Sequence, residues 1–262
     1  MIGEIDTSHQ QATYFLLSDP MVDLTLIPAG DIADIQTSKR FIRMYIPRTR
    51  EKLVLNFDVI ELFDFVPYIL MDKHIQWMHD AVRDNGLGLS LVEMRWYGVT
   101  DWTGNDAEAW MTTVLYEAYP ADLVIGKQNI NTLYMDIVTK DPLVDLPEFE
   151  KIPITDVQHH GTQVAREGST VYARWRTGKE DAIVGGRYGS GTTLMIPMGW
   201  DNVPETTERR WDYYVDFVIN HGYYVANVPL PEDPNLARRL RMAFNEYLTR
   251  KSLAGSLLDF VG

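Results

Sequence analysis

The stretch from Glu51 to Gly98 constrains the fold of this chain more than any other. A polar lead-in ending at Asp58 runs into the apolar sequence VIELFDF, a helical segment follows, and after Asn85-Gly86 a second apolar run, LGLSLVEM, stops before Arg95. This order predicts a strand, a crossing helix and a second strand with a sharp exit. In many α/β enzymes such an exit carries the nucleophile, so the residues after the second strand bear most directly on activity.

The helix of this unit is expected from about Met71 to Asn85. Gly86 supplies its stop, and Gly88, inside the next strand, allows a close approach of another backbone. His74 and His79 are five residues apart, whereas two metal ligands on one helix want a spacing near four, so we expect both at the surface or its boundary. The three-and-four spacing of a buried stripe is shared by Ile75, Met78, Ala81 and Val82.

Composition excludes several classes of function. The chain has 262 residues, no cysteine and a formal net charge of -13. A disulfide, a thiolate zinc site and a thiol nucleophile are therefore absent, and scattered basic residues among more numerous acids argue against nucleic-acid binding. We expect no cofactor and no metal. The N-terminal sequence lacks a basic region followed by an apolar core, and no apolar run is long enough to span a membrane, which predicts a cytoplasmic chain unless it is a fragment of a longer protein.

The remaining elements follow from local patterns. Strands are expected at 24–29, 41–47, 123–125 and 133–138, and a helix from Asn105 or Asp106 to about 118, with 139–158 as a long connection. From 164 to 198 the pattern is an antiparallel β extension, and C-terminal helices lie within 206–251. We predict one domain over 1–262, a three-layer, flavodoxin-like α/β fold with a mostly parallel sheet.

Two conspicuous motifs have ordinary structural explanations. The glycine-rich stretch from Gly185 to Gly191 resembles a phosphate loop, but a strand follows it and the lysine is missing, so a hairpin is expected. His159 and His160 would point to opposite faces of a strand, and a structural or surface role is favoured over a metal site.

Aromatic and polar residues follow two of the expected strands, at the carboxyl-end position where α/β proteins collect functional groups. They would suit a carbohydrate-binding or partner-binding surface, although the tryptophans also fit a role in packing loops onto the sheet. The residues concerned are Trp96, Asp101, Trp102, Asn105, Trp200, Asp201 and Asn202.

The order of elements resembles the class I glutamine amidotransferase-like superfamily over about Leu24 to Tyr224. The resemblance rests on NFDVIELFDF, on HIQWMHDAVRDNGLGLSLVEMRWYG, and on VYARWRTGKEDAIVGGRYGSGTTLMIPMGW followed by RRWDYYVDFVINHGYY. Members with glutaminase activity have a cysteine just after the second strand of the opening unit and a histidine after a late strand. Here Glu93, Met94 and Arg95 stand at the first place and Met198-Gly199-Trp200 at the second, so glutaminase activity is not expected.

The resemblance implies a degenerate active site and a non-catalytic domain that acts in assembly, as a homo-oligomer or with a partner protein, or in binding a small polar ligand. The alternative is a hydrolase or isomerase for a small polar substrate, such as a carbohydrate, that uses carboxylates near Glu93. Its candidate catalytic residues are Glu93, Arg95, Asp101 and Asp201, and its candidate ligand-binding residues are Trp96, Trp102, Trp200 and Asn202.

Overall fold

The computed structural model describes residues 2–3, 16, 19, 21–28, 35–63, 67–92, 106–124, 132–155, 162–178, 180–196, 211 and 213–230. Its helices are α2 (Ile35–Tyr45), α3 (Arg50–Asn56), α4 (Asp72–Asn85), α5 (Asp106–Met111) and α6 (Tyr214–Ala226), with 3₁₀ turns η1 (Pro67–Ile69), η2 (Val114–Ala118) and η3 (Phe149–Lys151). Its strands are β1 (Ile2–Gly3), β2 (Ile27–Pro28), β3 (Val59–Phe63), β4 (Gly88–Val92), β5 (Ala121–Val124), β6 (Thr132–Leu133), β7 (Met135–Ile137), β8 (Ile154–Thr155), β9 (Thr162–Ala165), β10 (Thr170–Trp175), β11 (Asp181–Tyr188) and β12 (Gly191–Ile196).

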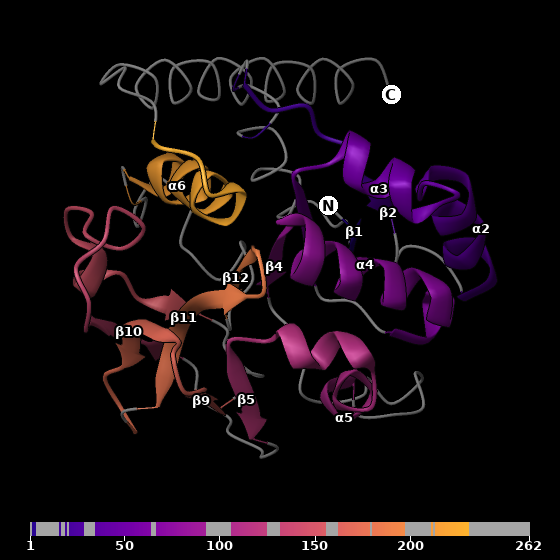
Figure 1. Cartoon of the computed structure of the whole chain (residues 1–262). Coiled ribbons are helices and arrows are strands. Elements are labelled where there is room, and N and C mark those ends of the chain that lie inside the picture. The colour runs from indigo at the N-terminus through magenta and orange to yellow at the C-terminus, as the bar shows by residue number, and fades with distance from the viewer. Residues whose placement is uncertain are drawn as a thin grey trace, which may run out of the picture.

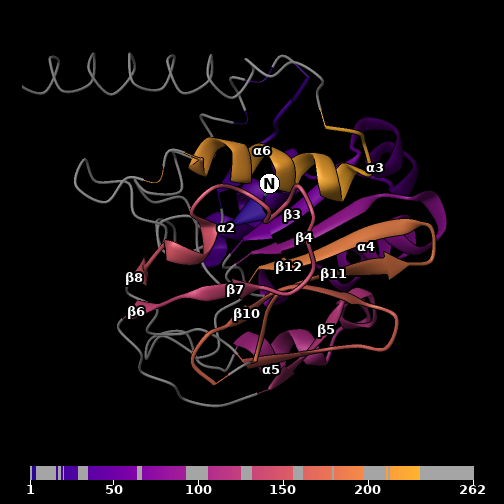
Figure 2. The same cartoon turned by 90° about the vertical axis from the view of Figure 1, so that its left-hand side faces the viewer.

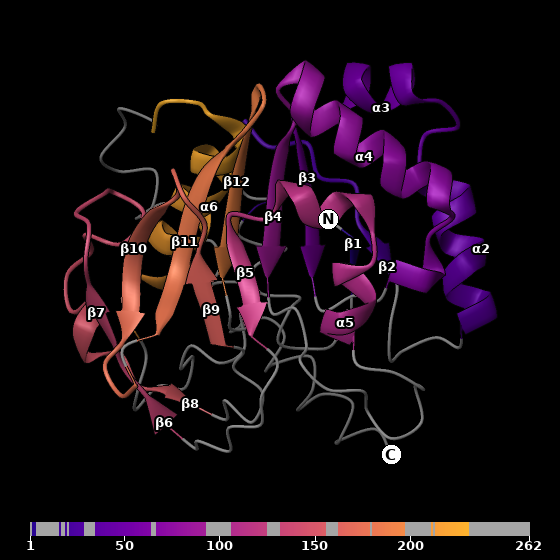
Figure 3. The same cartoon turned by 60° about the horizontal axis from the view of Figure 1, so that its bottom comes forward.

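The main sheet is mixed, which places the chain in the α/β class. Eight of its ten strands lie in the order β2-β1-β3-β4-β12-β11-β10-β7, and β9 joins β5 to β11. The ladders from β2 to β12 are parallel, and those among β12, β11, β10, β7, β9 and β5 are antiparallel. Figure 3 shows this order, with β10 and β2 toward opposite sides of the view. The predicted antiparallel extension is confirmed, but it forms about half of the sheet, which is therefore less parallel than expected.

The opening unit is confirmed as β3, α4 and β4. All five residues of β4 are buried, as expected for a central parallel strand covered on both faces. Gly86 ends α4 at a φ of 79°, the left-handed conformation that favours glycine. The four residues predicted as the inner stripe of α4 are also buried.

Helices pack on both faces of these strands. Phe63 and Val92 share one core cluster with the buried side of α6, whereas Leu62 and Leu91 share another with α4 and η2. This division follows from the alternation of side chains along a strand. Figures 1 and 2 show α6 on one side of β4 and β12, and α4 and α5 on the other.

Helix α6 packs closely on β4 because Gly88 has no side chain. A Cβ built at Gly88 would overlap the carbonyl oxygen of Val225 in α6. The expectation of a close backbone approach at this glycine is therefore confirmed, and the same interface brings the next inward residue of β4, Ser90, against α6.

Two predictions on this side of the fold are wrong. The segment 41–47, expected as a strand, lies mainly in helix α2, and Ser38, Ile42 and the residue just after the helix, Ile46, are buried at a spacing of four. His74 and His79, expected at the surface or its boundary, are 4% and 1% exposed. Helix α4 buries a wide face, because α3 and η2 pack against it in addition to the sheet.

Smaller differences concern the ends of elements. The lead-in before Asp58 forms helix α3, with Thr49 as its N-cap, and the helix predicted up to residue 118 is divided into α5 and η2. Only 27–28 of the first predicted strand pair with a neighbour, and the connection 139–158 includes η3 and β8. The glycine-rich stretch is the β11–β12 hairpin, as predicted. Within the described ranges, no helix has the length and apolarity needed to cross a bilayer.

Candidate functional site

The residues predicted to form the site lie outside the described residues. These are Glu93, Arg95, Trp96, Asp101, Trp102, Trp200, Asp201 and Asn202, and the same holds for Asn105 and for His159 and His160. The strands that precede these residues are described: β4 ends just before Glu93, and β12 ends at Ile196, before Trp200. Val92, the last residue of β4, is the register partner of Ile196, the last residue of β12, and the two strands are parallel. The chain therefore leaves the sheet at neighbouring points of one edge, where the prediction places the site.

A serine, a histidine and a glutamate come together beneath α6. Glu61 of β3 and Ser90 of β4 are register partners and point to the same face of the sheet. Ser90 Oγ lies 2.5 Å from His221 Nε2, and His221 Nδ1 lies 3.7 Å from Glu61 Oε2. The three residue types, and the sequence of contacts from Ser90 to His221 to Glu61, match a nucleophile, a base and an orienting acid.

Burial decides what this buried triad, Glu61, Ser90 and His221, can do. Ser90 is 0% exposed, His221 is 1% and Glu61 is 5%. Burial lowers the pKa of His221 to about 3, so its ring is neutral at neutral pH. A substrate has no access to Ser90 Oγ in this conformation. The triad instead supplies polar contacts between α6 and two central strands.

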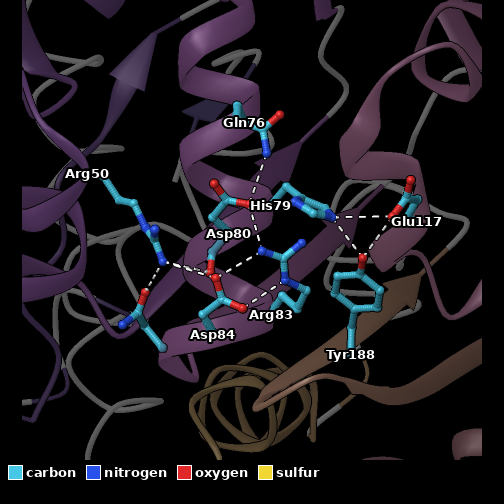
Figure 4. Close-up of polar contacts among 9 residues, drawn as sticks. Arg50, Gln76, His79, Asp80, Arg83, Asp84, Glu117 and Tyr188 are labelled. Atoms are coloured by element: carbon cyan, nitrogen blue, oxygen red, sulfur yellow. Dashed lines mark hydrogen bonds and ion pairs between the residues drawn. The ribbon is translucent and has the colours of Figure 1, made fainter.

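A second polar network joins α4 to η2 and β11 (Figure 4). His79 Nδ1 lies 3.0 Å from Asp80 Oδ1, and His79 Nε2 lies 2.8 Å from the hydroxyl of Tyr188. That hydroxyl donates to Glu117 Oε2 at 3.0 Å. Because His79 is buried and the Glu117 side chain is 64% exposed, the network runs from the core to the surface. It fixes the end of β11 against the helices that cover the sheet.

The outer side of α4 carries a cluster of ion pairs (Figure 4). Arg83 binds Asp84 with Nε at 2.8 Å and reaches Asp80 Oδ1 at 3.3 Å. Arg50 of α3 donates to Asp84 Oδ2 at 3.2 Å and to Asn85 Oδ1 at 2.8 Å. These exposed pairs add little free energy individually, but together they link α3 to the end of α4.

The pKa values of this network favour a structural role. Burial alone would raise the pKa of Asp80, but hydrogen bonds from His79 and Gln76 outweigh it and lower that pKa. Burial, and then the nearby carboxylate of Glu117, raise the pKa of Tyr188. Asp80 thus stays a carboxylate and Tyr188 stays protonated near neutral pH, so neither is tuned for proton transfer there.

The described ranges hold no group of three or more histidine and carboxylate side chains that could bind a metal. The polar set that sequence reasoning missed is the buried triad. A signal was present, because Glu61 and Ser90 each interrupt a short apolar strand sequence, VIELF and GLSLV. A polar residue in a strand buried on both faces needs a polar partner. The partner, His221, is distant in sequence, and only the tertiary fold identifies it.

Comparisons with known proteins show the fold. No protein-family model matches the chain, and no curated protein does. Two proteins of Salmonella typhimurium are similar in structure. Cytoplasmic protein STM1381 of strain LT2 has a TM-score of 0.66 and 17% identity over 86% of this chain and 97% of its own. Cytoplasmic protein STM3548 has a TM-score of 0.62 and 18% identity over 82% and 86%.

A ThuA-like protein from Parabacteroides merdae has a TM-score of 0.51 and 11% identity over 88% of this chain and 92% of its own. It has an amidotransferase-like fold, so the resemblance drawn from the sequence is supported at the level of fold. At these identities the similarity extends to the fold and not to activity.

Proposed function

We propose that this chain is a three-layer, amidotransferase-like domain that acts by binding a ligand or a partner and does not catalyse a reaction. The observation that carries the proposal is the burial of the Ser90–His221 pair, the nucleophile and base of the buried triad. The chain also has no cysteine, which removes the thiol chemistry of glutaminases. A cytoplasmic location remains part of the proposal.

The test is glutamine hydrolysis by the purified full chain, followed as ammonia release, beside hydrolysis of a simple ester and of aryl glycosides. We expect rates equal to those of buffer. Turnover that survives repurification and is lost in a Ser90→Ala or Glu93→Gln variant would refute the proposal. A Lys52→Gln variant, which changes an exposed helix residue, is the control for losses caused by handling.

Assembly is the form of binding that the surface supports. Met44 and Tyr45 at the end of α2 are 69% and 47% exposed, and Leu55 of α3 is 82% exposed. Exposed apolar side chains on two consecutive helices suit contact with another chain. Light scattering across a range of protein concentrations tests this directly. A monomer at every concentration would contradict homo-oligomerisation and leave ligand or heterologous partner binding as the proposed role.

The alternative enzyme would use Glu93, with Asp101 and Asp201, on a small polar substrate. One observation favours it, namely that Val92 and Ile196 end paired parallel strands, so the two segments that carry these carboxylates begin at one edge of the sheet. The glycoside arm of the same assay decides between the two proposals, because a carboxylate mechanism would show Glu93-dependent turnover with an intact Ser90.

A further inference from the structure

A pocket of about 120 Å³ lies between α2, η1 and the start of α4. Its apolar wall includes Ile42, Ile69 and Leu70, and its polar wall includes Lys39, Arg43 and His74. Because a buried water needs about 10–15 Å³ on this measure, the pocket has room for a group several times larger. Every charged side chain in its lining is basic, on a chain whose formal net charge is -13.

The two cations of the pocket are positioned by one helix. Lys39 and Arg43 are four residues apart on α2, so they lie on the same face. Within the described part of the chain, neither has a hydrogen bond or an ion pair with a carboxylate. This differs from Arg50 and Arg83 nearby, which are both paired. The pocket therefore holds positive charge that no described carboxylate pairs with.

His74 is a second, independent feature that points to a polar ligand. Its side chain lines the pocket and is 4% exposed, and its Nδ1 is buried with no hydrogen-bond partner among the residues that the structure describes. Burial, together with the charges of Lys73 and Arg43, lowers the pKa of His74 to about 4, so the ring is neutral near pH 7. A buried nitrogen without a partner is costly, and a ligand that hydrogen-bonds to it would remove that cost.

The N-terminus of α4 faces the same place. Met71, the N-cap residue of the helix, lines the pocket, and its side chain makes no capping hydrogen bond to the backbone N–H groups there. A 14-residue helix presents a partial positive charge and unpaired N–H groups at its N-terminus. Asp72 in the first turn offsets part of that charge, whereas Lys73 adds to it.

We propose that this pocket binds a small tetrahedral oxyanion of the phosphate class, either inorganic phosphate or the phosphate group of a monoester. Arg43 and Lys39 supply charge-assisted hydrogen bonds, His74 supplies a neutral partner, and the helix N-terminus supplies backbone donors. The apolar wall accommodates the carbon atoms next to the phosphate. The inference deepens the proposed binding role and rests on it only for its biological meaning, since anion binding is measured without any assay of turnover.

The experiment is a titration of the ¹⁵N-labelled full chain with inorganic phosphate at pH 7 and constant ionic strength, read from the amide signals of η1 and the first turn of α4. We expect saturable shifts in these signals. Arg43→Gln should weaken binding about ten- to a hundred-fold, because a charged hydrogen bond is lost, and Arg43→Lys should recover part of it. The matched control is Arg40→Gln, which removes an equal charge from α2 outside the pocket lining and should change the affinity less than about twofold.

Arg40 and Arg43 are both exposed on α2, so their variants are expected to fold, and their amide spectra verify it. Equal shifts with sodium chloride at matched ionic strength, no saturation, or equal affinity in Arg43→Gln would overturn the inference. Glycerol 1-phosphate separates the two sources, since tighter binding than phosphate identifies a monoester and weaker binding identifies the free ion. Any of these results leaves the turnover test of the proposed function unaffected.

Discussion

Removing Ser90 Oγ tests whether the buried triad stabilises the fold. In Ser90→Ala, His221 Nε2 loses a partner at 2.5 Å in a side chain that is only 1% exposed, so the variant should be less stable by about 1–3 kcal/mol. With an m-value of about 3 kcal/mol/M in urea, the unfolding midpoint falls by roughly 0.3–1 M. Urea unfolding followed by circular dichroism measures it.

A double-mutant cycle makes this prediction specific. His221→Leu should also destabilise the chain. The double variant should lose less stability than the sum of the two single losses, by at least about 0.5 kcal/mol, because Ser90 Oγ and His221 Nε2 then no longer leave each other unpaired. Ser190→Ala, in the exposed β11–β12 turn, is the control and should stay within about 0.5 kcal/mol of the parent. Additive single effects, or a Ser90→Ala variant as stable as the parent, would refute the reasoning.

Three further predictions use the same unfolding assay. Burial holds the pKa of His221 near 3 in the folded chain, whereas the unfolded chain takes up that proton below about pH 6.5, so His221 should contribute a fall in stability of about 2 kcal/mol from pH 7 to pH 5, beside a fall of similar sign from His74, and His221→Leu should lose the His221 contribution; equal pH profiles of the parent and His221→Leu contradict it. Gly88→Ala should destabilise by about 1–3 kcal/mol through overlap with α6, whereas Gly222→Ala, within α6 and with space for a methyl group, should be neutral or stabilising. Tyr188→Phe should cost about 1–3 kcal/mol by removing the hydroxyl that lies 2.8 Å from His79 Nε2, and an unchanged midpoint would contradict the network.

The opening unit could be predicted because its signals are local and consistent. An apolar run, a helical stripe and a glycine stop together specify β3, α4 and β4, and the spacing alone identified the four apolar residues that α4 buries against its neighbours. The hairpin at Gly185–Gly191 was predictable for the same reason, since turn residues separate two strand patterns.

The misassigned helix α2 shows where local reading is ambiguous. The sequence FIRMYIP alternates as a strand would, but its isoleucines Ile42 and Ile46 also fit a helical spacing that begins at Ser38. The contacts of this segment with η1 and β2 decide between the strand period and the helix period. The pocket was missed as a consequence, because Lys39 and Arg43 share a face only when this segment is a helix.

The burial of His74, His79 and His221 was not predictable from spacing. Each lies on a helix whose pattern marks an inner face, but whether a polar neighbour of that face is covered depends on elements distant in sequence. For His221 the deciding partner is Ser90, 131 residues away. The polar residues that interrupt apolar strands were the usable signal, and the tertiary fold supplied the rest.

The central claim, that the nucleophile-like serine is inaccessible, is tested most directly by a serine-reactive fluorophosphonate. The native full chain is incubated with the probe at pH 7, digested, and examined by mass spectrometry for modification of the peptide that contains Ser90. The account predicts no adduct on Ser90 in the folded chain, because its exposure is 0%. An adduct on Ser90 that disappears in His221→Gln would show an accessible, base-activated nucleophile and would contradict the proposed non-catalytic role.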